Sequence, residues 1–314
     1  GFLGSWLCDI LVAKNAKVYC IDNLSSGRAA NIKHLLPNKS FVFKKHDITK
    51  TPINLKPDYI FHLASRPSPD DYLNNEIQTI DTNTEGTRKI LELTRKTDAK
   101  LLFTSTSEVY GEATVFPTPE TYYGNVNPSG PRACYDESKR LCESLCMAYY
   151  RTYGINLRIV RLFNTYGPRM RSNDGRAVPE FITAAIQNRP VPIFGDGSQT
   201  RSLCYVSDTV EALQLLTSSS PKELEAYESK TPPIFNIGNP HETSINELIE
   251  ILGKICGTKI IPEYKNFSKP GTKRRVPDIT KLKKLGYTPL VTLDEGLKKT
   301  YDWYANYYRN KNHN

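Results

Sequence analysis

The sequence predicts an α/β protein in which a doubly wound parallel sheet is followed by a smaller domain of mixed helices and strands. Two observations carry this prediction. In the first half, short strand-like segments alternate with longer helix-like ones, and beyond about residue 164 proline and glycine interrupt the chain heavily. Such alternation is typical of parallel sheets with helices on both faces. The 314 residues suit one large α/β domain or two small ones.

Five segments of the first half are predicted as strands. They are short and rich in β-branched and aromatic residues, and turn-forming residues bound them. In chain order they are Lys17–Asp22, Phe41–Phe43, Tyr59–Ala64, Leu101–Thr106 and Leu157–Phe163.

Two longer segments repeat apolar residues at helical spacing and are predicted as helices. The first spans Ile77–Lys96, and its repeat consists of Ile80, Ile90, Leu91 and Leu93. The second spans Tyr135–Tyr153, and the residues that fall on one face are Leu141, Leu145, Ala148 and Tyr149.

Signals for turns and helix ends organise the second half. Ser218–Pro233 is polar and contains proline, so it is predicted as a surface loop. Gly257 is placed to end a helix. Two pairs have the spacing of a capping box and predict helix starts: Ser244 with Glu247, and Thr292 with Glu295.

The chain carries 42 basic and 33 acidic side chains, a formal net charge of +9. In the simpler interpretation, this surplus of positive charge only keeps the protein soluble. In the more specific one, it binds an anionic partner. Basic residues gather in two short groups, one with Arg169, Arg171 and Arg176 and the other at 273–275. Short groups suit a phosphorylated small molecule better than a duplex, so nucleic acid is disfavoured as a partner.

Seven cysteines are scattered along the chain without a CxxC pair. Such a set argues against a disulfide framework or a zinc site and favours a reducing compartment. No stretch approaches the roughly 18 uncharged apolar residues of a membrane span. The best candidate, 1–13, already contains Asp9. Without a basic region or an initiator Met at the start, no signal or transit peptide can be read.

The residues Gly1, Phe2, Leu3 and Gly4, followed by Asp22, form a pattern expected at a dinucleotide site. Glycines let the backbone approach a pyrophosphate that rests on a helix N-terminus. An acid at the end of the next strand bonds the adenosine ribose and repels a 2′-phosphate, which favours NAD over NADP. The pattern is weak alone, because G-x-x-G is common and Asp often forms turns. The strand and glycine that normally precede it are absent, so we expect that the sequence lacks its true N-terminus.

Tyr135 and Lys139 form a Y-x-x-x-K pair, and a spacing of four puts both on one face of the second predicted helix. Tyrosine, with an ordinary pKa of about 10, is a poor base at neutral pH. We expect the nearby ammonium, together with a positive nicotinamide ring, to lower the pKa of Tyr135. The alternative is an exposed ion pair on an amphipathic helix.

Thr106 and Glu108 lie where the fourth predicted strand ends. Strand alternation would put both side chains on the same face, near the carboxyl edge at which ligands bind in such sheets. A serine- and threonine-rich loop without a role is the alternative.

Taken together, these residues resemble the extended short-chain dehydrogenase/reductases that act on nucleotide sugars. Longer runs are similar to one branch of that family, the UDP-glucuronate decarboxylases, along nearly the whole chain. The runs are TSTSEVYG (104–111), CYDESKR (134–140), RLFNTYGPRM (161–170), GDGSQTRSLCYVSD (195–208) and RRVPDI (274–279). Two features depart from the branch: residues 218–233 have no counterpart, and Asp81 stands where a lysine is usual.

The resemblance implies a Rossmann-like NAD-binding domain over 1–163 and a nucleotide-sugar-binding domain over 164–314, with about 200–216 returning to the first. NAD would be the cofactor, and no metal would be needed. The residues that the resemblance assigns to NAD are Gly1, Phe2, Leu3, Gly4, Asp22, Asn23, Ser25, Ser26, Gly27, Asp47, Ile48, Leu63, Ser65, Thr82, Tyr135, Lys139, Thr165 and Arg176.

The resemblance also implies a reaction on UDP-glucuronate. Tyr135 would take the proton of the sugar 4-hydroxyl while hydride leaves C4 for NAD. Thr106 would bond the same oxygen, and Lys139 would hold the nicotinamide ribose. The 4-keto group would accept the electrons released as carbon dioxide departs, and protonation at C5 with return of the hydride would give UDP-xylose.

The resemblance assigns further residues to the sugar nucleotide. Glu108 and Arg275 would act in the decarboxylation, with Arg275 on either the carboxylate or the diphosphate. Tyr149, Asn164 and Arg201 would contact the nucleotide or sugar, and for Arg201 a surface salt bridge is the alternative.

Two other functions stay open. A 4-epimerase or 4,6-dehydratase would use the same cofactor, but dehydratases carry Asp-Glu where this chain has Ser107 and Glu108, and epimerases generally lack that glutamate. Serine is a poor general acid, so dehydration is disfavoured. A non-catalytic NAD-binding sensor is the remoter alternative, and the intact set of Thr106, Tyr135 and Lys139 argues against it.

Assembly and compartment follow from the resemblance alone. We expect a homodimer in which helices 77–96 and 135–153 pack across a two-fold axis. Some relatives are cytosolic, while others are held in the Golgi by an N-terminal span. The expectation is therefore a cytoplasmic protein, with the Golgi lumen as the alternative if such an anchor exists.

Overall fold

The computed structural model describes residues 1–219, 234–258, 260–266 and 273–312. It confirms the predicted α/β class with parallel strands. The largest sheet has the order β10–β5–β4–β3, and all its neighbouring strands are parallel. Its strands are β3 (Tyr59–His62), β4 (Lys100–Thr106), β5 (Leu157–Leu162) and β10 (Ile234–Ile237). A second parallel sheet pairs β1 (Val18–Asp22) with β2 (Phe41–Lys45).

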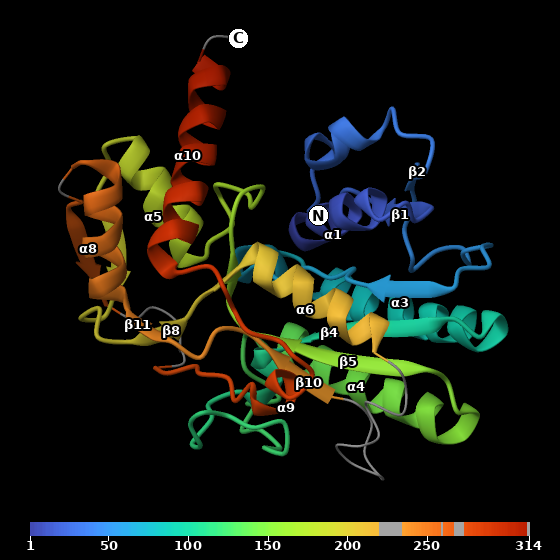
Figure 1. Cartoon of the computed structure of the whole chain (residues 1–314). Coiled ribbons are helices and arrows are strands. Elements are labelled where there is room, and N and C mark those ends of the chain that lie inside the picture. Colours follow the sequence, from blue (N-terminus) through green and yellow to red (C-terminus); the bar gives the residue numbers. More distant parts are fainter. Residues whose placement is uncertain (220–233, 259, 267–272, 313–314) are drawn as a thin grey trace.

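Side chains of the large sheet alternate between two apolar layers, as a doubly wound sheet requires. Leu101, Phe103 and Ile159 pack on one face with α3 and α4. Leu102 and Val160 pack on the other face with α6, which crosses in front of the strands in Figure 1. The three covering helices are α3 (Glu76–Thr97), α4 (Ala133–Tyr153) and α6 (Val206–Ser218).

The apolar face predicted on the second helix is only in part the face that α4 buries. Leu141 is 56% exposed, whereas half of the residues that α4 buries are small. These small residues are Cys134, Ser138, Cys142 and Cys146. Because small side chains let α4 approach α3 and the sheet closely, Leu141 is left outside, whereas Leu145 and Tyr149 pack partly buried against the same apolar cluster. Ile77 of α3 is also 67% exposed, so both helices present apolar side chains to the surface.

A separate apolar layer joins α1 (Phe2–Ala13) and the η1 turn (Ala29–Leu35) to the β1–β2 sheet. Cys8 of α1 packs there with Val18 and Phe41 of the two strands. The start of α1 lies next to the residues that follow β1, because a Cβ added to Gly27 would lie 3.1 Å from the backbone nitrogen of Gly1.

Helices dominate the second half, and some of them gather at the left of Figure 1. An apolar cluster joins α5 (Ala177–Ile186), α8 (Ile245–Cys256) and α10 (Leu293–Asn312) to the parallel pair β7 (Val191–Phe194) and β12 (Pro262–Lys265). The short elements are α2 (Pro69–Asn74), η2 (Ser107–Tyr110), β6 (Thr165–Tyr166), β8 (Thr200–Ser202), β9 (Cys204–Tyr205), β11 (Glu242–Ser244) and α9 (Thr280–Lys283).

Both predicted capping boxes are confirmed. The Ser244 hydroxyl accepts a 3.1 Å bond from the Glu247 amide, and the Glu247 carboxylate accepts a 2.8 Å bond from the Ser244 amide. Thr292 and Glu295 exchange the same two bonds at 3.2 and 3.4 Å. Gly257 ends α8 with a φ of 65°, as predicted. Residues 220–233, most of the predicted surface loop, lie outside the described residues.

Two segments beyond residue 164 pack with the first half. Helix α6 overlaps the segment expected to return, and β10, which the sequence analysis did not assign, pairs with β5. Both therefore support the sheet whose edge carries the candidate site. In the part of the chain that the structure describes, no helix is long and apolar enough to cross a bilayer.

Candidate active site

The candidate site begins where β4 ends at Thr106. The chain then turns into η2, and the Thr106 hydroxyl accepts a 3.2 Å bond from the amide of Glu108. Strand alternation was the wrong reason for placing these two residues together, because Glu108 belongs to a tight turn and not to an extended strand. The turn nevertheless holds both at the carboxyl edge of the sheet.

A buried ion pair holds α4 against the sheet beside this edge. Arg161 of β5 donates two bonds to the Glu143 carboxylate, at 2.7 and 2.9 Å. One turn earlier on α4, Lys139 Nζ donates a 2.9 Å bond to the carbonyl oxygen of Thr104. Tyr135 lies a further turn back and is only 4% exposed. The reactive pair of the sequence analysis therefore lies in the interior, and an exposed ion pair is excluded for it.

Tyr135 is held between an aromatic ring and a hydroxyl. Its ring stacks on that of Tyr72, with centroids 5.1 Å apart and planes 5° apart. Burial raises the pKa of Tyr135 well above its ordinary value, although a hydrogen bond with Thr106 and the charge of Arg176 act in the opposite direction. The expected lowering of this pKa by Lys139 is therefore wrong for the protein by itself, because burial outweighs the neighbouring cations.

Burial also lowers the pKa of two basic side chains of this region, Lys139 and His62. It lowers the pKa of Lys139 to about 8, so this ammonium can exchange a proton close to neutral pH. Burial and the charge of Lys139 together lower the pKa of His62 to about 3. The neutral His62 ring meets the Thr87 hydroxyl at 2.9 Å.

His62 should make the protein sensitive to acid. Its folded pKa of about 3 lies below its ordinary value of 6.5, so between these values the unfolded chain binds a proton that the folded chain does not. Its contribution to stability is complete above about pH 6.5 and should fall by about 1.4 kcal/mol per unit as the pH drops toward 3. Urea unfolding at pH 7, 6 and 5 should show this slope in the wild type and a smaller one in His62→Gln. Equal slopes would contradict the assignment.

Three arginines surround Glu108. Its carboxylate forms ion pairs with Arg132 and Arg275, and the charge of Arg201 also acts on it. Burial alone would raise the pKa of Glu108, but the arginines outweigh it and hold the pKa below its usual value. Three guanidinium groups and one carboxylate leave the cluster with surplus positive charge for an anionic ligand.

Arg201 does not form the surface salt bridge that was its alternative. Burial, and then the charge of Arg275, lower the pKa of Arg201 to about 10, and its guanidinium donates a 2.7 Å bond to the carbonyl oxygen of Thr200. Arg201 therefore lies inside the arginine cluster without a carboxylate of its own among the ion pairs of the described residues.

Asp136, next to Tyr135, completes the cluster. One of its oxygens lies 3.5 Å from the Arg132 guanidinium, and the other is buried without a hydrogen-bond partner in the described residues. Burial and the charge of Glu108 raise the pKa of Asp136 to about 7. This carboxyl group is therefore partly protonated at neutral pH.

The start of α1 and the end of β1 form a cradle that fits NAD. A Cβ added to Gly1 or Gly4 would meet no atom within 4 Å, so both glycines border open space. A Cβ on Gly27 would lie 2.8 Å from the Asp22 carboxylate, which explains the need for glycine there. Asp22 also accepts a 2.7 Å bond from the Leu24 amide. The free amides of a helix N-terminus and an acid at a strand end suit a pyrophosphate and a ribose.

Hydrogen bonds connect several of the elements that carry the other residues assigned to NAD. Asn23 donates a 3.2 Å bond to Asp47, which ties the turn after β1 to the segment after β2. Ser65, after β3, donates a 2.8 Å bond to Asn83 of α3, and Asn83 donates a 2.8 Å bond to Ser138 of α4. The remaining residues lie on the same elements: Phe2 and Leu3 in α1, Ser25 and Ser26 after β1, Ile48 after β2, Leu63 after β3 and Thr82 in α3.

Several assigned residues lie elsewhere or have structural partners. Tyr149 donates a 2.6 Å bond to Glu92 of α3, and 14 residues of helix place it about 21 Å from Tyr135, which favours a structural role over the assignment to the substrate. Thr165 contacts the Thr209 hydroxyl at 3.0 Å and joins β6 to α6. Asn164 lies between β5 and β6, where its carbonyl oxygen accepts a bond from the Cys204 amide.

The first basic group is not an open anion site. Arg169 pairs with Asp9, Arg171 with Asp71, and Arg176 with Asp174. Of the second group, Arg274 pairs with Glu242 on the surface, and only Arg275 reaches the candidate site. The positive charge of the candidate site therefore comes from arginines that are far apart in the sequence, at positions 132, 201 and 275.

Three site residues were missed by the sequence analysis: Tyr72, Arg132 and Asp136. Arg132 and Asp136 flank Tyr135 at a spacing of four, and this i, i+4 pattern of opposite charges was a readable signal. Tyr72 lies in the short helix α2, and nothing local in the sequence points to its stacking on Tyr135.

Comparison with known proteins shows which family and which relatives the chain resembles. The model of the NAD dependent epimerase/dehydratase family matches residues 1–238. UDP-glucuronic acid decarboxylase 1 of Xenopus tropicalis is 42% identical over 305 residues, which cover 97% of this chain and 70% of that protein. UDP-glucuronic acid decarboxylase 1 of Arabidopsis thaliana is 43% identical over 300 residues, covering 95% of this chain and 66% of that protein. The chain thus spans about two thirds of the length of these relatives.

Solved structures agree with this relationship. UDP-glucuronic acid 4-epimerase from Bacillus cereus, in complex with UDP-glucuronic acid and NAD, is 30% identical with a TM-score of 0.84, and the match covers 98% of this chain and 97% of that one. UDP-glucose 4-epimerase from Thermotoga maritima, with UDP-glucose, is also 30% identical, with a TM-score of 0.86 and the same coverage.

Proposed function

The chain belongs to the NAD dependent epimerase/dehydratase family, and within it we propose that this protein decarboxylates UDP-glucuronate to UDP-xylose. NAD is the cofactor of this family. Relatives at 42% and 43% identity that cover nearly the whole chain are UDP-glucuronic acid decarboxylases, and this supports the proposal.

The arginine cluster is the observation that carries the proposal. Glu108 stands two residues beyond Thr106, so the cluster adjoins the Tyr135–Thr106 pair. A sugar with its 4-hydroxyl at Tyr135 can therefore direct a neighbouring C6 carboxylate toward Arg275 and Arg132. UDP-glucuronate is an anion at both ends, and the surplus of guanidinium groups matches that charge.

The chemistry needs an oxidation at C4 before carbon dioxide can leave. Bound NAD supplies the acceptor for the C4 hydride and a positive charge that favours a nearby phenolate. Tyr135 then takes the proton of the 4-hydroxyl, and Thr106 holds the same oxygen. The resulting ketone is β to the C6 carboxylate and accepts the electron pair of the breaking C5–C6 bond, so no metal is required.

Lys139 and Glu108 have separate roles in this scheme. Lys139 would hold the nicotinamide ribose, and its positive charge would favour loss of the Tyr135 proton. Glu108 repels the substrate carboxylate, which favours loss of charge as carbon dioxide departs, and positions a water that returns a proton to C5. We assign Arg275 to the carboxylate, and Arg201 and Asn164 to the remainder of the sugar nucleotide.

Product analysis tests this function against its relatives. The purified protein is incubated with NAD and UDP-glucuronate, and the sugar nucleotides are examined by mass spectrometry. A product that has lost carbon dioxide is expected. A product of unchanged mass would indicate a 4-epimerase, and loss of water would indicate a dehydratase, so either result would contradict the proposal.

We propose that the protein is a homodimer and that the exposed apolar side chains of α3 and α4 form its interface. Leu141 and Ile77 are the most exposed apolar residues of these helices. Leu141→Glu should convert the dimer to a monomer in light scattering, because two buried carboxylates would face each other across a two-fold axis. Leu36→Glu is the matched control, since Leu36 is similarly exposed at 53% but lies elsewhere. A monomeric wild type, or a dimeric Leu141→Glu, would contradict the proposed interface.

A further inference from the structure

A buried hydrogen-bond network adjoins the turn that carries Glu108. Its centre is Asn236, the third residue of β10, whose side chain is fully buried. The amide oxygen of Asn236 accepts a 2.7 Å bond from the Tyr110 hydroxyl. Tyr110 is 2% exposed and ends η2, two residues after Glu108. A side chain of the large sheet therefore holds the turn of the candidate site.

The same asparagine also holds the segment that carries Arg275. The amide nitrogen of Asn236 donates bonds of 2.9 and 3.0 Å to the carbonyl oxygens of Thr118 and Asp278. Thr118 pairs with this segment through its own backbone. Its amide donates a 2.9 Å bond to Val276, and its carbonyl oxygen accepts a 3.0 Å bond from the Asp278 amide. Because Val276 directly follows Arg275, one asparagine joins the segment of Arg275 to η2.

The network continues into the ion pair between β5 and α4. Arg161 donates a 3.0 Å bond to the Tyr110 hydroxyl, in addition to its two bonds to Glu143. Ser105 of β4 donates a 2.5 Å bond to the same Glu143 carboxylate. The Tyr110 hydroxyl thus accepts one bond and donates another to Asn236. Since buried polar groups that are fully bonded make a core rigid, the network fixes η2 in place.

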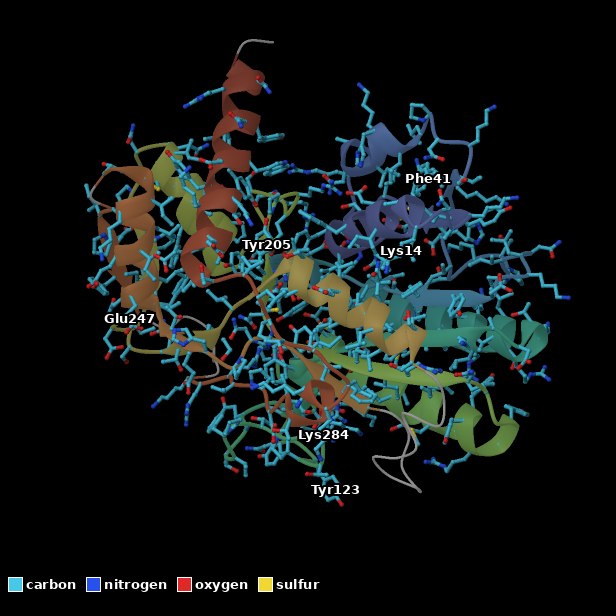
Figure 2. All side chains as sticks on the ribbon, in the orientation of Figure 1. Lys14, Phe41, Tyr123, Tyr205, Glu247 and Lys284 are labelled. Atoms are coloured by element: carbon cyan, nitrogen blue, oxygen red, sulfur yellow. The ribbon has the colours of Figure 1, made fainter. Side chains whose placement is uncertain are left out.

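A further contact from α4 fixes the same turn. Arg140 donates bonds of 2.9 and 2.8 Å to the carbonyl oxygens of Val109 and Tyr123. The side chain of Tyr123, labelled in Figure 2, is 92% exposed, so this residue takes part through its backbone. Bonds at Val109 and Tyr110 therefore hold the chain immediately after Glu108.

The network does not extend to the other half of the candidate site. Within the described residues, the side-chain hydrogen bonds of Asn236 and Tyr110 do not involve Tyr135 or Thr106. Tyr135 is held instead by the ring of Tyr72 and by Thr106. The structure therefore supports the two halves of the site by separate sets of contacts.

We propose that Tyr110 and Asn236 are positioning residues for the decarboxylation, which they serve by setting the placement of Glu108 against Arg275. The inference rests on the proposed function, in which these two charged groups act on the C6 carboxylate. A displacement of about 1 Å at reacting groups can cost about 10²-fold in rate. Loosening the network should therefore slow loss of carbon dioxide and leave oxidation at C4 to proceed.

Replacing Tyr110 with phenylalanine tests this division of the reaction. Phenylalanine keeps the ring that packs against Phe163 and removes only the hydroxyl. With NAD and UDP-glucuronate, kcat should fall about tenfold, the effect of about one hydrogen bond. The share of cofactor that is reduced during turnover, measured by absorbance, should rise. Asn236→Asp keeps the acceptor for Tyr110 but loses both amide donors, and it should change both quantities in the same direction.

Tyr166→Phe is the matched control. Tyr166 is also 2% exposed, and its hydroxyl donates a 3.3 Å bond to the carbonyl oxygen of Leu293, outside the network. Its kcat and its share of reduced cofactor should equal those of the wild type. Wild-type kinetics in Tyr110→Phe would overturn the inference, and so would a loss of kcat without a rise in reduced cofactor.

A double-mutant cycle distinguishes failure of this inference from failure of the proposed function. Urea unfolding is measured for Tyr110→Phe, Arg275→Met and the double variant. Because the network joins the two segments, the two losses of stability should not add, whereas those of Tyr166→Phe and Arg275→Met should add. Additive losses for Tyr110 and Arg275 overturn the inference. A wild type that releases no carbon dioxide from UDP-glucuronate overturns the proposed function, while non-additive losses would still establish the link.

Discussion

Replacing Tyr135 with phenylalanine is expected to lower kcat for UDP-glucuronate by about 10²–10⁴-fold, the usual contribution of a general base. Phenylalanine keeps the ring that stacks on Tyr72 and removes only the hydroxyl bonded to Thr106. NAD binding should therefore be nearly unchanged, and steady-state kinetics with a calorimetric titration of NAD measure the two effects.

Tyr149→Phe is the matched control for this experiment. It removes a hydroxyl from the same helix, but that hydroxyl bonds Glu92 on the surface of α3. Its kcat should equal that of the wild type. Equal activity of Tyr135→Phe would remove the phenol from the mechanism, and equal loss in both variants would point to damage to α4 instead of lost chemistry.

Replacing Glu108 with glutamine is expected to have the second largest effect. The change leaves the buried Arg275 and the partly exposed Arg132 without their common carboxylate, and breaking a buried ion pair costs about 3–5 kcal/mol of stability. The substrate carboxylate should then replace Glu108 between the arginines, so KM should not rise. Because the arginines would then stabilise the negative charge that the carboxylate must lose, release of carbon dioxide should slow by at least about 10²-fold.

Separate effects on kcat and KM distinguish a role of Glu108 in decarboxylation from a purely structural one. Urea unfolding, kcat and KM are measured for Glu108→Gln and for Glu263→Gln, whose carboxylate pairs with Lys265 on the exposed surface. The control should lose less than about 1 kcal/mol and keep its kinetics. A Glu108→Gln variant that loses substrate binding and catalysis in proportion would contradict the assignment to decarboxylation.

Local features of this fold were predictable because local chemistry decides them. Every predicted strand is present to within two residues at each end, and the two capping boxes and the end of α8 at Gly257 agree with the structure. Pairing of β10 with β5 depends on residues about 75 apart in sequence, and no pattern within Ile234–Ile237 reports it. The buried face of α4 also depends on its neighbour α3, so Leu141 misled the prediction.

In the candidate site too, the arrangements set by neighbours in sequence were predictable, and those set by the fold were not. Tyr135 and Lys139 share a helix, so their spacing sufficed to place them on one face. The arginines around Glu108 come from residues 132, 201 and 275, and only the fold can bring them together. Spacing also could not show that burial outweighs the cations at Tyr135, because a pKa depends on how deeply a side chain lies.

Running the reaction of UDP-glucuronate in heavy water tests most directly whether a ketone at C4 drives loss of the C6 carboxylate. We expect a UDP-pentose that has lost carbon dioxide and carries a single solvent deuterium at C5, because the electron pair left at that carbon must take a proton from the site. A UDP-sugar that keeps its carboxylate, or a pentose without deuterium at C5, would contradict this expectation.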